Sequence, residues 1–198
     1  MITIPSNAKG LIFDLDGTIA NTMPNHFKAW RKAVSPYGID FDEELFMSLT
    51  GMARKPTINK LNQLFNTKMN PEIVGGIKEE YFKLLVSETK EIEVVANVIR
   101  KFHKKLPMAI GTGSTTEGAK QTLEIIGMQQ YFNIVITSDD VVYGKPHPET
   151  FLKCAELMQV NPTECVVFED GILGMKAAKT AGMMVIDINE YFKTEFIK

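Results

Sequence analysis

Hydrophobic and polar positions follow two different patterns along this chain, and the pattern changes near residue 22. Apolar residues run without interruption at positions 11–13, whereas between residues 26 and 87 they recur at three- and four-residue steps. An uninterrupted apolar run is typical of a strand buried on both faces, and the longer periodicity is typical of amphipathic helices. We therefore predict a buried strand and then a segment without strands, with helices near residues 26–34, 43–49, 56–65 and 71–87.

After residue 95, short apolar runs alternate with helical stretches. The predicted strands cover residues 108–111, 134–137, 165–168 and 183–188, and the predicted helices cover residues 96–104, 116–127, 148–158 and 172–181. Strands that alternate with helices in this way form crossover units and a parallel sheet. We predict an α/β fold with a three-layer core, residues 1–21 and 96–198, an inserted all-helical cap, residues 22–95, and a loose tail from residue 189.

Two aspartates follow the first predicted strand. Asp14 and Asp16 are separated by one residue, and Gly17 ends the strand. Side chains two positions apart on a strand point to the same side, so both carboxylates can project into one space at the carboxyl edge of the sheet. Because two such carboxylates repel each other unless a cation or a shared proton relieves them, a divalent metal is expected here.

Three further polar clusters occur where predicted strands end. Ligands of open parallel sheets bind beyond the carboxyl ends of the strands, so these clusters are candidate site residues. Taken singly, each has an ordinary alternative: the hydroxyl and acidic residues could cap the following helices, and the lysine could be solvated. Together they combine carboxylates for a hard cation with hydroxyl and ammonium groups for phosphate oxygens, which indicates Mg²⁺ as the metal. The clusters are Thr112, Gly113 and Ser114; Lys145 between Gly144 and Pro146; and Glu169 with Asp170.

In this order and at these strand ends, the motifs resemble those of the haloacid dehalogenase superfamily. The helical insert after the first motif is similar to the β-phosphoglucomutase-like branch, and parts of the chain resemble small sugar-phosphatases of the fructose-1-phosphatase type. The resemblance implies a Rossmann-like core in which Asp14 is the nucleophile and forms an aspartyl phosphate. It also implies that Asp16 acts as acid and then as base, helped if burial and a nearby carboxylate raise its pKa.

The resemblance further implies roles for the remaining candidates. Thr112 and Lys145 would bind the transferring phosphoryl group, with Gly113 and Ser114 in the substrate site. Mg²⁺ would be held by Asp14, the backbone carbonyl of Asp16 and Asp170, with Glu169 nearby. In the cap, the mutase pattern implies substrate contacts for His26, Arg54 and Lys83, although each could instead be a flanking or solvated residue. The chain departs from the family pattern at Asn21, where a second acid is usual, so altered hydrogen bonding at the hinge is expected.

We therefore expect a Mg²⁺-dependent phosphatase that acts on small sugar phosphates. Asp16 favours phosphate chemistry over carbon–halogen chemistry, because dehalogenases of this superfamily have a single aspartate in the first motif. The alternative is a β-phosphoglucomutase, which interconverts β-glucose 1-phosphate and glucose 6-phosphate. A non-catalytic module on the same fold is disfavoured by the intact pair Asp14 and Asp16.

Composition narrows the partners and the compartment. The formal net charge is −2, which gives no electrostatic reason to expect nucleic acid or a membrane surface as partner. The N-terminal residues lack the pattern of a signal peptide, so the expected location is the cytoplasm. We expect a monomer or weak homo-oligomer that binds a small phosphorylated sugar. Cys154 and Cys165 are expected to be small core residues without a disulfide.

Overall fold

The computed structural model describes residues 2–196 and has a parallel sheet of five strands in the order β3-β2-β1-β4-β5. The α/β, Rossmann-like fold class expected from the sequence is confirmed, with β1 in the middle of the sheet. The strands are β1 (Gly10–Phe13), β2 (Met108–Gly111), β3 (Val135–Ile136), β4 (Cys165–Glu169) and β5 (Met184–Asp187). The helices are α1 (Met23–Val34), α2 (Glu43–Leu49), α3 (Arg54–Phe65), α4 (Pro71–Leu85), α5 (Glu93–Phe102), α6 (Thr116–Ile125), α7 (Glu149–Met158) and α8 (Ile172–Thr180). Short 3₁₀ turns are η1 (Ser35–Tyr37), η2 (Val86–Glu88), η3 (Gln129–Tyr131), η4 (Pro162–Glu164) and η5 (Ile188–Glu190).

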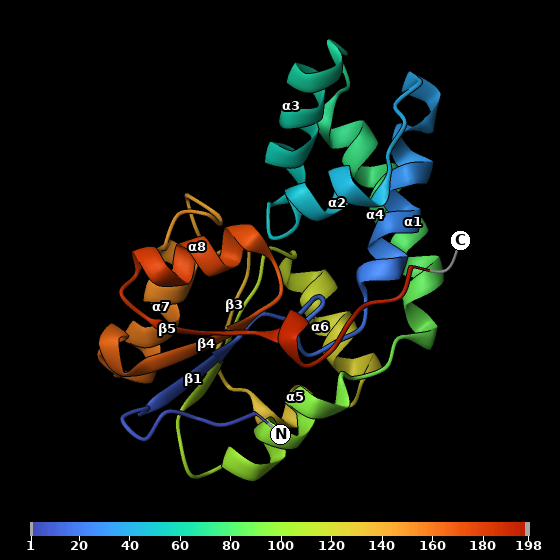
Figure 1. The fold of residues 1–198 in the computed structure, drawn as a ribbon. Helices are drawn as coiled ribbons and strands as arrows, with labels where there is room; N and C mark the ends of the chain where they lie inside the picture. The colour runs from blue at the N-terminus through green and yellow to red at the C-terminus, as the bar shows by residue number, and fades with distance from the viewer. Residues whose placement is uncertain (1, 197–198) are drawn as a thin grey trace.

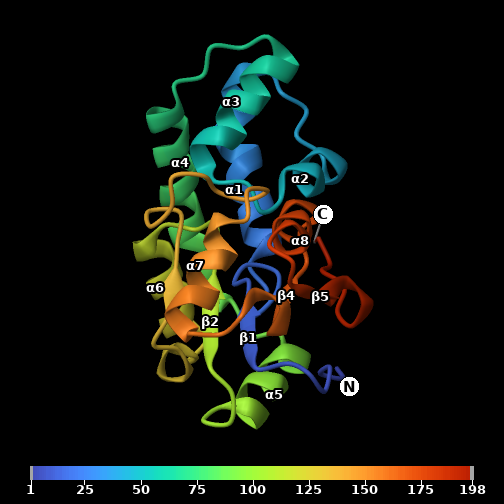
Figure 2. The ribbon, with the colours of Figure 1, turned by 90° about the vertical axis from the view of Figure 1, so that its left-hand side faces the viewer.

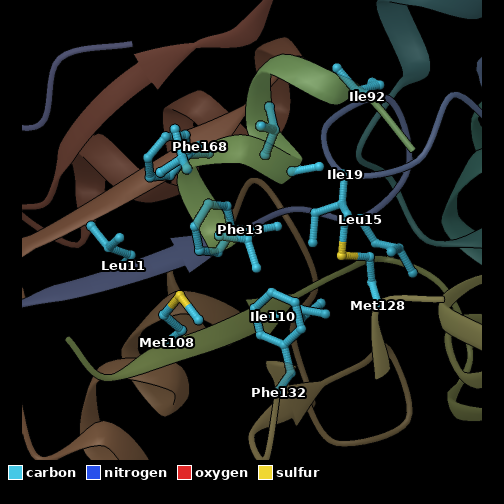
Figure 3. Close-up of a cluster of buried hydrophobic side chains, with 14 of the residues drawn as sticks. Leu11, Phe13, Leu15, Ile19, Ile92, Met108, Ile110, Met128, Phe132 and Phe168 are labelled. Atoms are coloured by element: carbon cyan, nitrogen blue, oxygen red, sulfur yellow. The ribbon is translucent and has the colours of Figure 1, made fainter. Parts of the chain in front are cut away.

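Alternate residues of β1 enter two separate hydrophobic clusters, one on each face of the sheet. Leu11 and Phe13 pack with α5 and α6, whereas Ile12 packs with α7 and α8. Phe13 stacks on Phe168 of β4 with 4.5 Å between ring centres, and Figure 3 shows this pair at the centre of the first cluster. The uninterrupted apolar run of the first strand is thus explained by burial on both faces. Helices, sheet and helices form the three layers seen in Figure 1.

Helices α1–α4 form a cap that lies to one side of the core, as Figures 1 and 2 show. The cap has its own apolar cluster, to which Phe27, Trp30 and Leu61 belong. The predicted insert ends at residue 95, but Val95 lies in α5 and packs in the core cluster together with Ile92. None of the helices within residues 2–196 has the length and apolar character that crossing a membrane requires.

The chain passes between core and cap twice, at neighbouring points. The backbone N–H of Asn21 donates to the carbonyl of Lys90 at 2.9 Å, and Ala20 forms an antiparallel bridge with Glu91. The side-chain oxygen of Asn21 is buried and has no hydrogen-bond partner among residues 2–196. The two chain crossings, at residues 20–21 and 90–91, therefore pair through their backbones and form the hinge between core and cap. The side-chain oxygen of Asn21 takes no part in this pairing.

Candidate active site

The segments after β1 and β4 bring three buried carboxylates together at the carboxyl edge of the sheet. Asp14, Glu169 and Asp170 each offer an oxygen atom, and these atoms lie within 4.8 Å of one another. Gly17 makes this approach possible: its φ is +86°, and a Cβ at this position would overlap the Asp170 carboxylate. The turn after the first aspartate pair therefore requires glycine both for its conformation and for space.

Lys145 lies between two of these carboxylates. Its Nζ donates to Asp14 Oδ1 and to Glu169 Oε2, each at 2.6 Å, and its side chain is fully buried. Burial disfavours the charged ammonium, but Asp14 and Glu169 outweigh that effect and hold the pKa of Lys145 above its ordinary value. The lysine is therefore a fixed positive charge beside the Asp14 carboxylate.

The acidic cluster fits a divalent cation. Burial and the charge of Glu169 raise the pKa of Asp14 to about 8, although Lys145 acts in the opposite direction. Burial, Glu169 and Asp14 likewise raise the pKa of Asp170 well above its ordinary value. A divalent ion with oxygen ligands would relieve this repulsion and favour the ionised carboxylates. Asp14, Glu169 and Asp170 therefore form a cluster that could hold a metal, as the sequence motifs predict.

Asp16 is held by donors from the core and from the cap. Thr22 Oγ1 donates to its Oδ1 at 2.7 Å, Ser114 Oγ donates to its Oδ2 at 2.6 Å, and His26 Nε2 lies 3.0 Å from Oδ1. Burial alone would raise the pKa of Asp16, but His26 and the two hydroxyl donors bring it well below its ordinary value. The raised pKa that would help Asp16 act as an acid is therefore not present in this arrangement.

Thr112 and Ser114 after β2 and Asp170 after β4 do not cap the helices that follow them. Thr115 caps α6 by accepting from the backbone N–H of Gly118 at 3.2 Å, which leaves Thr112 and Ser114 at the cavity. Thr112 is buried, and its Oγ1 accepts from the N–H of Ser114 at 3.0 Å. Asp170 instead accepts from Thr18 Oγ1 at 3.1 Å. These contacts remove the capping alternative that the sequence left open.

The cap contributes a group of charged and aromatic side chains opposite the sheet edge. His26 stacks on Phe82 with 4.1 Å between ring centres, and burial together with Lys78 lowers the pKa of His26. Glu79 Oε2 lies 3.7 Å from Arg54 Nη1 and 3.7 Å from Lys78 Nζ. His26 and Arg54 line the cavity, as the sequence motifs predicted. Lys78 and Glu79 of α4 also line it, and the sequence motifs did not identify them.

Lys83 does not line the cavity. Its Nζ pairs with Glu117 at 2.8 Å, and both side chains are exposed. The lysine that lines the cavity is Lys78, whose side chain is 8% exposed. Lys78 lies at four-residue steps from Val74 and Phe82, both buried, so its position in an apolar stripe of α4 was the available sequence signal.

Core and cap together line a cavity with a volume of about 120 Å³. Gly113 forms part of the wall, where a Cβ would lie 3.2 Å from the carbonyl oxygen of Gly51 in the cap. Of the predicted site residues, the lining includes Asp14, Asp16, His26, Arg54, Thr112, Gly113, Ser114, Glu169 and Asp170. Apolar lining comes mostly from the cap: Met23, Trp30, Phe41, Phe46, Leu49 and Phe82.

The structure thus combines a parallel sheet, a buried lysine and an acidic cluster at its carboxyl edge, and an inserted helical cap over that edge. The sequence profile of the haloacid dehalogenase-like hydrolases matches residues 11–188, and the chain belongs to this family. This membership, together with phosphatase and phosphoglucomutase relatives, shows that the protein is an enzyme.

Individual relatives are similar over nearly the whole chain. Fructose-1-phosphate phosphatase YqaB of Escherichia coli (strain K12) is 38% identical over 179 residues, which cover 90% of this chain and 95% of that protein. A β-phosphoglucomutase of Bacillus subtilis (strain 168) is 26% identical, with 92% of this chain and 84% of that protein covered. The crystal structure of a hydrolase from Pseudomonas syringae has the same fold, with a TM-score of 0.85, 22% identity and coverage of 93% of this chain and 87% of that one.

Proposed function

We propose that this protein is a Mg²⁺-dependent phosphatase that hydrolyses small sugar phosphates through an aspartyl phosphate on Asp14. The observation that carries the proposal is the placement of Asp14 on the cavity wall, fixed 2.6 Å from Lys145 and within the acidic cluster. A relative 38% identical to this chain is a fructose-1-phosphate phosphatase, which supports a sugar monophosphate as the substrate class.

In the proposed reaction, an Asp14 oxygen attacks phosphorus and the bond between phosphorus and the sugar oxygen breaks. Asp16 gives a proton to the leaving sugar oxygen. In the second step Asp16 takes a proton from water, the water oxygen attacks phosphorus, and release of phosphate restores Asp14. Lys145 and Thr112 bind the phosphoryl oxygens in both steps, so that fixed positive charge meets the charge of the transition state.

Asp14, Asp170 and the backbone carbonyl of Asp16 would hold Mg²⁺, with Glu169 beside them. When bound, the ion screens the repulsion between an anionic nucleophile and an anionic substrate. The low pKa of Asp16 applies without substrate; a phosphate dianion placed beside it would raise that pKa and favour the protonated acid. His26, on the same carboxylate, orients Asp16 toward this task.

The cap residues His26, Arg54 and Lys78 would contact the remote part of the substrate, and the apolar cap lining would exclude bulk water. The other partners follow from the sequence: we expect no nucleic acid or membrane partner and a cytoplasmic location. A monomer or weak homo-oligomer is expected, and size-exclusion chromatography with light scattering tests this.

A panel of sugar phosphates, with and without Mg²⁺, tests the function. We expect phosphate release from at least one small sugar monophosphate, its loss on chelation of the metal, and its loss in Asp14→Asn. The proposal is contradicted if no ester of the panel releases phosphate.

The mutase remains the second candidate, because a phosphoglucomutase is 26% identical to the chain. Incubation with β-glucose 1-phosphate and a bisphosphate primer separates the two, when free phosphate and glucose 6-phosphate are followed independently. Rapid formation of glucose 6-phosphate with little free phosphate would establish the mutase instead.

A further inference from the structure

The cap side of the cavity carries two cations and one carboxylate that neither the nucleophilic nor the acid–base step uses. Arg54 is the first residue of α3, and Lys78 and Glu79 are neighbours on α4. Glu79 Oε2 lies 3.7 Å from a nitrogen of each cation. Within residues 2–196 neither Arg54 nor Lys78 has another ion-pair partner, so this carboxylate is their shared counter-charge.

The apolar surroundings strengthen the electrostatic interactions of Arg54, Lys78 and Glu79. Lys78 is buried and its Nζ lies 4.6 Å from the ring centre of Phe82, and other aromatic side chains, such as Trp30, line the same cavity. Electrostatic interactions in such an apolar setting are stronger than in water. Arg54 is held in place by packing on Gly75, because a Cβ there would lie 2.8 Å from Arg54 Cδ. The stem of Arg54 is therefore packed against α4, the helix that carries Lys78 and Glu79.

We propose that Glu79 is a specificity-determining residue that restricts this end of the cavity to sugar hydroxyls and rejects a second phosphate. With Glu79 ionised, the two cations and the carboxylate together carry a single positive charge. A hydroxyl can accept from Lys78 or Arg54 and also donate to Glu79. A phosphate dianion would have to displace the carboxylate or lie beside it, and like charges placed together are strongly unfavourable.

This inference rests on the proposed function, because it assumes that a phosphate ester is bound with its reacting phosphoryl group at Asp14. It also bears on the choice between hydrolysis and transfer. Any transfer of the phosphoryl group back to a sugar monophosphate passes through a bisphosphate, whose second phosphate would face the cap. A cavity that rejects bisphosphates leaves water as the favoured acceptor.

Fructose 1-phosphate and fructose 1,6-bisphosphate form a matched pair of probes that differ only in the second phosphate. Their dissociation constants are measured by titration calorimetry in the Asp14→Asn protein with Mg²⁺ present, so that neither probe is hydrolysed. Glu79→Gln, which keeps the shape of the side chain, is added to this background. We expect it to improve binding of the bisphosphate relative to the monophosphate by about tenfold or more.

Glu80→Gln is the control, because it removes the same charge from the exposed neighbouring position. We expect it to change the ratio of the two dissociation constants less than about twofold. Equal ratios in the two variants, or an Asp14→Asn protein that binds neither probe, would overturn the role of Glu79. The binding measurement requires no turnover. It therefore tests the role of Glu79 separately from the phosphate-release assay that tests the proposed function. Thermal melts confirm that each variant is folded.

Discussion

Lys78 is a buried cation whose charge is only partly balanced by a neighbouring carboxylate. Burial lowers its pKa, and Glu79, which acts most strongly in the opposite direction, lies 3.7 Å away, beyond hydrogen-bond distance. A ligand that offers oxygen atoms to Nζ would supply the missing hydrogen bonds. This lysine therefore gains more from substrate than an exposed lysine would.

We predict that Lys78→Met lowers kcat/KM for the preferred sugar phosphate by about 10- to 100-fold, the size expected for a lost charged hydrogen bond. Its melting temperature should not fall, because the variant removes a poorly paired buried charge. Lys83→Met, at the exposed position, should stay within about twofold of the wild type. Equal losses in the two variants, measured by steady-state kinetics, would contradict the role of Lys78.

Most of the candidate site residues that line the cavity were identifiable from sequence because they lie at fixed places in short motifs. Asp14, Asp16, Thr112 and Asp170 each lie within three residues of the end of an apolar run. Parallel pairing brings those strand ends to one edge. The cap offers no such rule, since a helix displays its residues on all sides and its rotation is set by packing. The choice of Lys83 instead of Lys78 reflects this difference.

Helix α8 packs so close to Glu169 that only glycine fits at position 174. A Cβ at Gly174 would overlap the carboxylate of Glu169, which accepts from Lys145 and from the N–H of Gly171. The packing of α8 on β4 and the position of Lys145 therefore depend on one glycine in the helix.

We predict that Gly174→Ala displaces Glu169, abolishes most activity and costs about 1–3 kcal/mol of stability, as overpacked sites do. Gly76→Ala is the matched control, because a Cβ at this helical position has open space around it. That substitution should stabilise the protein by about 0.5–1 kcal/mol. Chemical denaturation of both variants measures the difference, and a stable, fully active Gly174→Ala protein would refute the argument.

The segment between β3 and α7 carries Lys145 and is held by the first residue of α7. Glu149 accepts from the backbone N–H of Val142 at 3.0 Å and of Tyr143 at 2.9 Å. These hydrogen bonds, with a smaller contribution from Lys153, lower the pKa of Glu149. A lowered pKa in the folded state stabilises the protein above the ordinary glutamate value, near 4.5, and the effect is lost as the pH falls through the folded-state value.

We predict that Glu149→Gln melts at a lower temperature than the wild type at about pH 7, and that the difference narrows as the pH falls below about 5. The variant should also lower kcat, because the segment that positions Lys145 is less constrained. Calorimetry across this pH range provides the measurement. A difference in melting temperature that is constant with pH would show that the carboxylate charge is not the cause.

Element boundaries departed from expectation for identifiable reasons. Helix α3 starts at Arg54 although Pro56 suggested a later start, because proline is tolerated in the first helical turn. Helix α5 starts at Glu93, where two β-branched valines obscured the helical pattern. Strand β3 is an edge strand paired on one side only and is two residues long. Local pattern thus predicted which elements exist, while their ends depend on tertiary contacts.

Metal binding should couple the site to the stability of the whole molecule. The acidic cluster destabilises the folded chain by repulsion among Asp14, Glu169 and Asp170, and an ion that binds only the folded state stabilises it by mass action. At a Mg²⁺ concentration about ten times the dissociation constant, we predict a gain of about 1.4 kcal/mol and a rise in melting temperature of about 3–6 °C. Asp170→Asn should lose most of this rise, and NaCl at equal ionic strength should not reproduce it.

The C-terminal segment connects the core to the cap a third time. The sequence suggested a loose tail from residue 189, of which residues 197–198 lie outside the described part of the chain. Figure 1 shows the segment after β5 running from the sheet toward α1. The ring of Phe196 meets Phe27 of α1 at 5.4 Å and Phe46 of α2 at 5.8 Å, both edge-on. Because Phe46 also lines the cavity, this contact links the tail to the roof of the site.

We predict that Phe196→Ala loosens the cap without loosening the sheet. Two edge-on aromatic contacts contribute about 1–2 kcal/mol together, so hydrogen exchange of amides in α1 and α2 should accelerate by about tenfold. Exchange in β1 and β4 should stay unchanged, because their strands are buried in the other clusters. Tyr191→Ala, an exposed aromatic of the same segment, should have no effect on the cap. If Phe196→Ala exchanges like the wild type in α2, the hinge pairing at Asn21 and Lys90 is enough to hold the cap, and substrate entry is independent of the tail.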